Sequence, residues 1–282
     1  MKRTSLKRTM VEFGLKRIVC LLSVVPAGAV AAFCQQPDVQ TIIQRSVQAN
    51  QRDFAAAPNY SYDECDKVAQ GTRTYRVMMI DGSPYNRLIA VNKKPLPEAK
   101  ARQQEQQLQQ EIAKRKSESA EDRKKRIASY ENDRKRDHTM LDQMALAFNF
   151  ELLGNRKLGG RDVYYLKATP RPGYKPPSMD AQVLPGMTGH LWIDRDTFQW
   201  VKVTARVMRP VTIEGFLAQV EPGTNFELEM MPVGDGIWLE KHYSMHSHSK
   251  VLFLFSRSSS EEEWYSNYKR VSGSSQETRA SR

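Results

Sequence analysis

Hydrophobic residues early in the chain follow a helical period and then give way to strand-like runs. Within residues 38–57 the apolar positions form one stripe: Val39, Ile42, Ile43, Val47 and Phe54. This spacing predicts an amphipathic helix, which the side chain of Asp38 can cap at its start and which ends before Pro58. Three strand-length runs then follow, over residues 60–67, 72–80 and 85–91.

From residue 150 onward the pattern is almost continuously β. In the run 198–207, small apolar residues alternate with Lys202, Thr204 and Arg206, so one face of this strand is apolar and the other polar. Strands are predicted over residues 150–155, 161–168, 189–193, 198–207, 211–220, 225–232, 236–245, 250–257 and 263–270. The proline-rich residues 170–187 predict an extended loop.

Two helical segments separate the early strands from the later ones. Residues 95–138 mix both signs of charge with many glutamines, which predicts a charged helical hairpin, of the coiled-coil kind, that projects from the domain. It is either a solvated surface or a docking arm for a partner or a membrane. Residues 139–150 are apolar and predict a short helix, which is either part of the core or a lid over an apolar cavity.

These elements together predict a mainly β fold with helices, of the α+β class. About ten antiparallel strands with one polar face form a sheet that must curl or close to bury its other face. We therefore expect one domain over residues 32–271, built on a curved antiparallel sheet. The helix of residues 38–57 packs on this sheet or across its open end, and the charged insertion follows the third strand.

The charge of the chain changes this picture only after its location is considered. The 282 residues contain 43 Lys and Arg against 32 Asp and Glu, a net charge of +11 that is typical of nucleic-acid-binding proteins. With 40% hydrophobic residues, the composition excludes a multi-span membrane protein and a wholly disordered chain. The four tryptophans lie beside acidic residues instead of clustered Lys and Arg, which argues against a nucleic-acid partner.

Much of the positive charge lies in an N-terminal export signal. Six basic residues precede an apolar run over residues 18–33 that ends in small residues, the pattern of a secretory signal peptide over residues 1–31. The run is shorter than the roughly 20 residues of a membrane anchor, which is the alternative. Cleavage after Ala31 or Ala32 removes six positive charges and one negative charge, so +11 becomes +6.

Two cysteines remain after this cleavage. In an oxidising compartment, Cys34 and Cys65 can form one disulfide, and two unpaired thiols are the alternative. A lipid anchor on Cys34 is a further alternative, although the bulky Phe33 before it departs from the usual lipidation pattern. The polar residues 272–282 predict a disordered tail.

The motifs of common enzyme classes are absent from the sequence. It contains no Gly-x-Ser-x-Gly, Walker, His-Glu-x-x-His or Cys-x-x-Cys pattern, so we predict no enzymatic activity and no cofactor. The strongest candidate for a metal site is His242, His246 and His248, which share one face of a strand with Glu240 and could ligate zinc. Exposed histidines on a polar strand face are the alternative.

The later strands resemble the outer-membrane lipoprotein-sorting proteins. Their hairpins are matched by the run Gly-His-Leu-Trp-Ile-Asp at residues 189–194, by residues 198–203, and by Gly-Asp-Gly-Ile-Trp-Leu at residues 234–239. Residues 265–270 resemble their closing strand. The resemblance implies a half-open barrel in the periplasm of a Gram-negative-type bacterium, or on the periplasmic face of its outer membrane. It implies a cavity that holds lipid or lipoprotein acyl chains, without enzymatic activity, but the charged insertion is longer than in the family.

On this interpretation, the cavity is lined by apolar side chains of the strands and of the apolar helix. The candidates are Met144, Phe148, Trp192, Val203, Phe226, Trp238 and Phe253. Each of them could instead be an ordinary core residue. Two other functions stay open: an envelope sensor or scaffold that binds a protein partner through residues 95–138, and a metal-dependent enzyme at the histidines.

Overall fold

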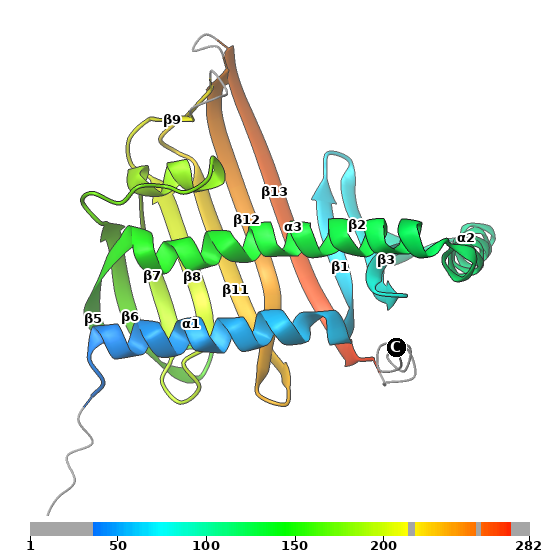
Figure 1. Ribbon diagram of the computed structural model, residues 1–282, viewed down its shortest axis with the longest axis horizontal. Helices are drawn as coiled ribbons and strands as arrows, with labels where there is room; N and C mark the ends of the chain where they lie inside the picture. Colours follow the sequence, from blue (N-terminus) through cyan, green and yellow to red (C-terminus); the bar gives the residue numbers. More distant parts are fainter. Residues whose placement is uncertain (1–35, 214–217, 252–254, 272–282) are drawn as a thin grey trace, which may run out of the picture. The chain divides into compact units, whose positions relative to one another are not determined.

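The fold is built on one antiparallel sheet that curves without closing (Figure 1). The computed structural model describes residues 36–271, apart from residues 214–217 and 252–254. The helices are α1 (Val39–Ala56), η1 (Ala57–Asn59), α2 (Glu98–Ser117), α3 (Ala120–Ala147) and η2 (Asp180–Gly186). The early strands are β1 (Tyr60–Val68), β2 (Gly71–Ile80), β3 (Ser83–Val91) and β4 (Lys94–Pro95). The later strands are β5 (Phe148–Leu158), β6 (Arg161–Pro170), β7 (Met187–Asp194), β8 (Trp200–Val207), β9 (Val211–Ile213), β10 (Ala218–Val220), β11 (Asn225–Gly234), β12 (Ile237–Val251) and β13 (Phe255–Arg270).

The order of the strands brings the first strand beside the last. It runs β4-β3-β2-β1-β13-β12-β11-β8-β7-β6-β5, and the short strands β9 and β10 pair beside β12. The first strand therefore pairs with the last, and Tyr60 lies opposite Arg270. This arrangement confirms the predicted α+β class with a curved, half-open antiparallel sheet.

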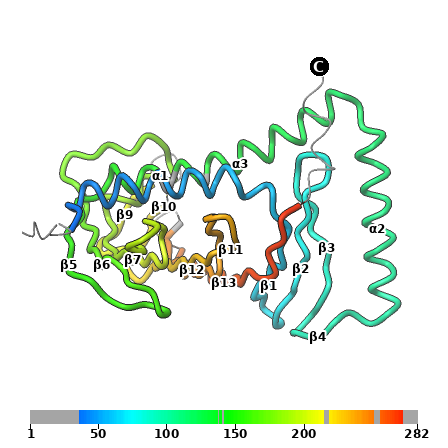
Figure 2. Tube along the Cα trace, turned by 90° about the horizontal axis from the view of Figure 1, so that it is seen from below, coloured from blue at the N-terminus to red at the C-terminus, as the bar shows by residue number. Residues whose placement is uncertain are grey.

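The helices α1 and α3 run side by side across the concave face of this sheet (Figures 1 and 2). The Asp38 carboxylate accepts a hydrogen bond of 2.8 Å from the Thr41 amide, as a helix cap does. One stripe of α1, including Ile42 and Ile43, is buried in the core. The predicted helix over residues 38–57 and its packing across the open sheet are therefore confirmed.

The charged insertion forms the two predicted helices, but it does not project from the domain. Helix α2 lies beside β3, and α3 crosses over the sheet beside α1 (Figure 2). The corner between the helices is held by Arg115, which is 5% exposed and donates to the carbonyl groups of Ile80, Ser83 and Pro84. These bonds satisfy carbonyl groups of the β2–β3 turn, so the insertion is part of the fold.

The predicted apolar helix over residues 139–150 is not a separate element. Its first part is the last turns of α3, which continues from the charged segment without a break to Ala147, and Phe148 already begins β5. Hydrophobic content changes along this helix because its charged part lies near the sheet edge and its apolar part covers the core. The change from charged to apolar residues therefore marks a change in what the helix packs against, whereas the helix itself continues unbroken.

Two predicted strands near the C-terminus have other bounds. The predicted strand over residues 250–257 is wrong, because β12 continues to Val251 and β13 begins at Phe255, directly opposite Val251. The predicted strand over residues 211–220 is β9 and β10, which pair with each other. The proline-rich residues 170–187 include the short helix η2, which packs against α3.

The hydrophobic core lies under one half of the helical layer. Buried side chains of β6, β7 and β8, such as Leu166, Leu191 and Val203, pack against α1 and η2. Several predictions fall outside the described residues: the signal peptide, Cys34 and therefore its disulfide with Cys65, Phe253, and the tail over residues 272–282. Within the described residues, no helix is long and apolar enough to cross a membrane.

Candidate ligand-binding cavity

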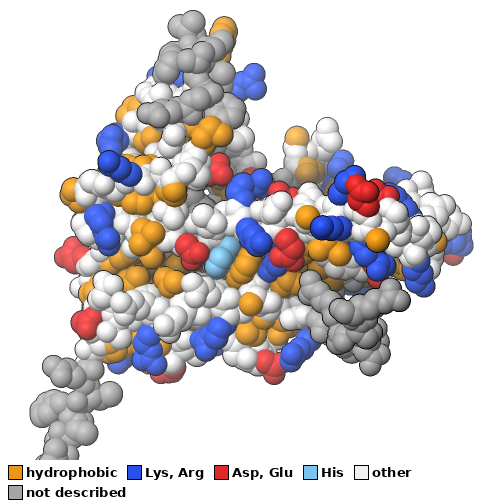
Figure 3. Space-filling view, viewed as in Figure 1, with side chains coloured by type: hydrophobic (Ala, Val, Ile, Leu, Met, Phe, Trp, Pro, Cys, Tyr) orange, Lys and Arg blue, Asp and Glu red, His pale blue; other side chains and the backbone are white. Residues whose placement is uncertain are grey.

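A cavity of about 1220 Å³ lies between the concave face of the sheet and the helices above it. Its floor comes from β1, β2, β7, β8 and β11–β13, and its cover from α1, α3 and η2. Seen from the helix side, hydrophobic side chains gather between α1 and α3 (Figure 3). Ligand pockets of proteins commonly measure about 300 to 1,000 Å³, so this cavity has room for a large ligand.

The part of the cavity under η2 and the end of α3 is apolar. Alternate residues of β11, among them Phe226, Leu228 and Met230, turn toward the cavity because side chains alternate between the faces of a strand. The opposite wall and neighbouring floor add Met144, Phe148, Val183, Leu184, Met187 and Ala205. We call this set, including the three residues of β11, the apolar half.

The floor changes character at β12, β13 and β1. Five tyrosines of these strands line it, and we call three with neighbouring rings the tyrosine wall: Tyr62, Tyr265 and Tyr268. The ring centroid of Tyr62 lies 5.9 Å from that of Tyr265 and 5.3 Å from that of Tyr268. The pairing of β1 with β13 brings these rings together although some 200 residues separate them in the chain.

Carboxylates accompany the tyrosine wall. Glu240 and Glu263 also line the cavity, and we call them the carboxylate pair. The hydroxyl of Tyr265 donates to Glu263, and that of Tyr268 donates to the Glu240 carbonyl oxygen at 2.8 Å. Behind them, Glu64 and Asp66 lie near Glu263, with one carboxylate oxygen of each within 4.8 Å of the others.

Burial and mutual repulsion shift the titration of these groups. Loss of water around the half-buried Glu263 raises its pKa, and the surrounding protein also raises the pKa of Glu240, which is exposed within the cavity. Burial, together with the negative charge of Asp66, raises the pKa of Glu64 to about 8, so this carboxyl group holds a proton at neutral pH. The tyrosine wall behaves likewise, since burial and the neighbouring glutamates raise the pKa of all three hydroxyl groups.

Asp53 of α1 closes this side of the cavity. Its side chain is 3% exposed and belongs to the lining. The Oδ1 atom accepts from the Trp238 amide at 3.1 Å and from Gln199 Nε2 at 3.2 Å, whereas the Oδ2 atom is buried without a hydrogen-bond partner. Burial raises the pKa of Asp53 to about 6.

Helices α1 and α3 are joined above the cavity by an aromatic and cationic contact. Phe54 of α1 stacks on the His138 ring of α3 with centroids 4.0 Å apart. The Arg134 guanidinium lies 4.2 Å from the centroid of the Phe54 ring and also donates to the Phe54 carbonyl oxygen. A contact of this kind holds the two helices together without the close packing of a core.

The structure brings four of the predicted cavity residues into the lining. They are Met144, Phe148, Phe226 and Trp238. Val203 faces the same side of the sheet but is buried in the packed core. Their contact with a ligand stays a prediction, and Phe253 lies outside the described residues.

Trp192 is not part of the cavity, which corrects its prediction. Its neighbours Leu191 and Ile193 are buried in the core, so Trp192 points to the other face of the sheet. There it packs beside Tyr165 and His190, with ring centroids 4.9 and 6.1 Å away. The hairpin forms as the sequence motif predicts, but the register of β7 turns its tryptophan outward.

The predicted alignment of Glu240 with the three histidines is also wrong. In the pairing of β11 with β12, Glu229 lies opposite His242 and Met230 opposite Glu240, so Lys241 is an extra residue. This bulge reverses the alternation of faces, and Glu240 turns into the cavity while the histidines turn away from it. Instead, His242 stacks against Trp264, and His248 Nδ1 lies 2.9 Å from Ser258 Oγ. Among the described residues, the histidines belong to no group close enough to hold a metal ion.

The tyrosine wall and Asp53 are sites that the sequence pattern does not reveal. Alternation over residues 60–67 places Tyr62 and Glu64 on one face, but nothing local indicates that this strand pairs with the last one. The position of Tyr268 is also not predictable from alternation, because the β1–β13 register shifts between Ser61 and Asp63. The pattern of residues along the chain therefore does not predict this site, because the site depends on the pairing of strands that are distant in sequence.

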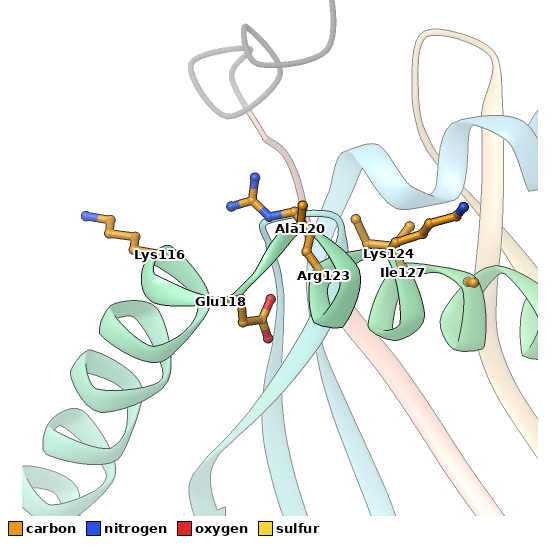
Figure 4. Close-up of a pocket in the computed structure, with 7 residues that line it drawn as sticks. Lys116, Glu118, Ala120, Arg123, Lys124 and Ile127 are labelled. Carbon is orange, nitrogen blue, oxygen red and sulfur yellow. The ribbon is translucent and has the colours of Figure 1, made fainter.

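A second hollow, of about 610 Å³, lies at the corner between α2 and α3. It is bordered by Ile127 and by the charged residues Lys116, Glu118, Arg123 and Lys124. The charged side chains extend in different directions (Figure 4). Glu118 is already paired with Arg126 at 2.6 Å. Since its charges do not converge on one point, this hollow is a weaker candidate than the cavity.

Comparison with known proteins gives distant structural matches only. No protein-family model matches the chain, and no curated protein matches it. A solved outer membrane lipoprotein-sorting protein domain from Vibrio parahaemolyticus aligns at 12% identity over 82% of this chain and 94% of that chain, with a TM-score of 0.32. A DUF1329 family protein from Desulfovibrio piger aligns at 12% identity over 83% and 94%, with a TM-score of 0.31. The Pseudomonas aeruginosa MucA/MucB complex aligns at 10% identity over 82% and 96%, with a TM-score of 0.23.

Proposed function

We propose that this protein is an exported, non-enzymatic cell-envelope protein that binds lipid or lipoprotein acyl chains in the cavity. In this role it takes part in the sorting or transport of lipoproteins to the outer membrane. The observation that carries the proposal is the cavity of about 1220 Å³ with its apolar half, which is lined by aliphatic, methionine and phenylalanine side chains. The N-terminal pattern of residues 1–31 supports export.

The energetics of such a site require no reactive group. A buried methylene contributes about 0.8 kcal/mol, so about twelve methylenes contribute about 10 kcal/mol before the costs of association are subtracted. Met144 and Met230 on opposite sides of the apolar half are flexible side chains that adapt to chains of different shape. Ligand entry requires α1 and α3 to separate, and the Phe54–His138 and Phe54–Arg134 contacts between them can break without exposing a packed core.

Filling the apolar half tests the proposal. Met230→Trp places a bulky ring in the cavity, and we expect the affinity for a fluorescent long-chain fatty acid to fall about tenfold or more, as measured by titration. Leu153→Trp is the matched control, since Leu153 on β5 is 42% exposed and lies outside the cavity. Equal affinity of both variants and the unmodified protein would contradict binding in this cavity.

A protein-binding role of the insertion is the other function that the sequence leaves open. Deletion of residues 95–138 cannot separate the two roles, because most of α3 lies in this segment and α3 covers the cavity. Substitutions on the exposed face of α2 leave the cavity lining unchanged and are the appropriate way to examine a partner.

A further inference from the structure

The tyrosine wall has the geometry of a cation-binding surface. Its three rings lie in the cavity lining with centroid distances of 5.3 and 5.9 Å about Tyr62. The face of an aromatic ring is negatively polarised, and several rings side by side are a recurrent way to bind an ammonium group. The hydroxyl groups of this wall contribute nothing to the binding of an alkyl chain, so they indicate a polar part of the ligand.

The charges beside this wall are negative. The carboxylate pair lines the same part of the cavity, and Asp66 adds a further acidic group behind it, next to the protonated Glu64. The basic residues of the lining, Arg134 and Arg136, lie on α3 and bind Glu131 and Asp133 of the same helix. These ion pairs lie within α3 and do not involve the acidic groups of the floor. There, burial and the neighbouring acidic groups raise the pKa of Glu64 and of Glu263.

Asp53 supplies an independent observation on the same side of the cavity. It is almost completely buried, and one of its carboxylate oxygens has no hydrogen-bond partner. Leaving a buried acceptor of this kind unpaired costs about 1 to 3 kcal/mol, and more when it is charged. Asp53 is close enough to Glu240 for the Glu240 charge to raise its pKa, so both groups favour a cation at this end.

We propose that the cavity selects an amphiphile with a positively charged head group, a primary amine or a quaternary ammonium. The head lies between the tyrosine wall and the carboxylate pair, and the hydrocarbon chain extends into the apolar half. This inference rests on the proposed function, because it names the head group of the ligand whose chain the cavity binds. It adds a distinction that burial of an acyl chain alone does not make, since an apolar pocket is indifferent to charge at the ligand's end.

Three single-chain detergents of equal length provide the test. Dodecyltrimethylammonium, dodecyl maltoside and dodecyl sulfate, each kept below its micelle concentration, are titrated into the protein without its signal peptide, and heats of binding are measured. We expect the cationic probe to bind at least about tenfold more tightly than the neutral one, and the anionic probe to bind most weakly.

Two substitutions assign this preference to the site. Glu240→Gln removes one charge of the carboxylate pair, and Tyr62→Leu removes the central ring of the tyrosine wall. Each is expected to lower the affinity for the cationic probe about tenfold and to leave that for the maltoside within about twofold. Glu151→Gln, at an exposed carboxylate of β5 outside the cavity, is the matched control and should change neither value.

The outcomes separate this inference from the proposed function. Equal binding of the three probes, or a preference for dodecyl sulfate, would overturn the cationic head group while the acyl-chain cavity stands. The cationic head group is likewise overturned if Glu240→Gln and Glu151→Gln bind the cationic probe equally well. Failure of all three probes to bind would contradict the proposed function itself and the inference with it.

Discussion

At the scale of single residues, the cavity combines groups that sequence pattern could and could not reveal. Phe226 was identifiable because regular alternation with Glu227 and Glu229 places it on the apolar face of its strand. Regular alternation predicts Glu240 on the face of the histidines, because the pattern of polar residues does not indicate the bulge at Lys241. Tyr62 and Tyr265 meet only through the pairing of the first strand with the last.

The acidic groups behind the tyrosine wall make stability depend on pH. Glu64 titrates at about pH 8 in the folded protein and near 4.3 when unfolded, so the unfolded chain loses this proton first. The stabilisation is complete below about pH 4 and is lost as the pH rises through about 8. Urea unfolding at about pH 5 and about pH 8.5 should therefore show a lower free energy of unfolding at the higher pH.

Glu64→Gln is expected to reduce this pH dependence, because the amide keeps the neutral form at every pH. Glu151→Gln is the control, as its carboxylate is exposed on β5. A free energy of unfolding that rises between the two pH values, or an unchanged dependence in Glu64→Gln, would show that this carboxyl group is not held neutral by its surroundings.

At the scale of elements, helix and strand types were largely predictable, and their attachments were not. The spacing of α1 and the capping residue Asp38 identify that helix from local information alone. By contrast, the polar sequence of residues 95–138 indicated a projecting hairpin. A helix that is attached to a sheet by hydrogen bonds of its side chains has as polar a sequence as a helix surrounded by water. Arg115 shows the difference: a charged residue in the pattern is a buried anchor in the fold.

Arg115→Ala is expected to loosen α2 from the sheet. Its guanidinium donates to three carbonyl groups of the β2–β3 turn and pairs with Glu111 at 2.7 Å. Leaving these buried acceptors unpaired should lower the free energy of unfolding by about 2 to 4 kcal/mol.

The loosening is measured by amide hydrogen exchange, with faster exchange expected in α2. Arg102→Ala is the control on the same helix, because Arg102 is largely exposed and pairs only with Glu98 in the adjacent turn. If both variants exchange and unfold like the unmodified protein, the corner at Arg115 does not hold the insertion in place.

At the scale of the whole molecule, the sequence pattern was sufficient for the fold class and for a curved sheet under helices. A large sheet with one apolar face leaves few other arrangements. The division of the cavity into an apolar half and a tyrosine wall could not be predicted, because it depends on which strands are neighbours. The order β1-β13-β12-β11-β8 places the acidic strands on one side of the floor and the apolar ones on the other.

The net charge of the whole chain differs in sign from the charged side chains of the cavity floor. The chain carries +11, which is typical of proteins with anionic partners, yet the cavity floor gathers its acidic side chains. Part of the positive charge belongs to residues 1–17 and part to the mixed charges of the insertion. The net charge of the chain therefore does not describe the groups that line the cavity floor.

If the cavity holds a lipid chain, the purified protein should carry lipid, and the lipid content of the protein can be measured. The protein without residues 1–31 is purified without detergent and its extract analysed by mass spectrometry, in parallel with Met230→Trp. We predict about one lipid molecule per protein chain, with the amount reduced several-fold in Met230→Trp. A protein that carries no lipid, and that takes up none when mixed with lipid vesicles, would contradict this account.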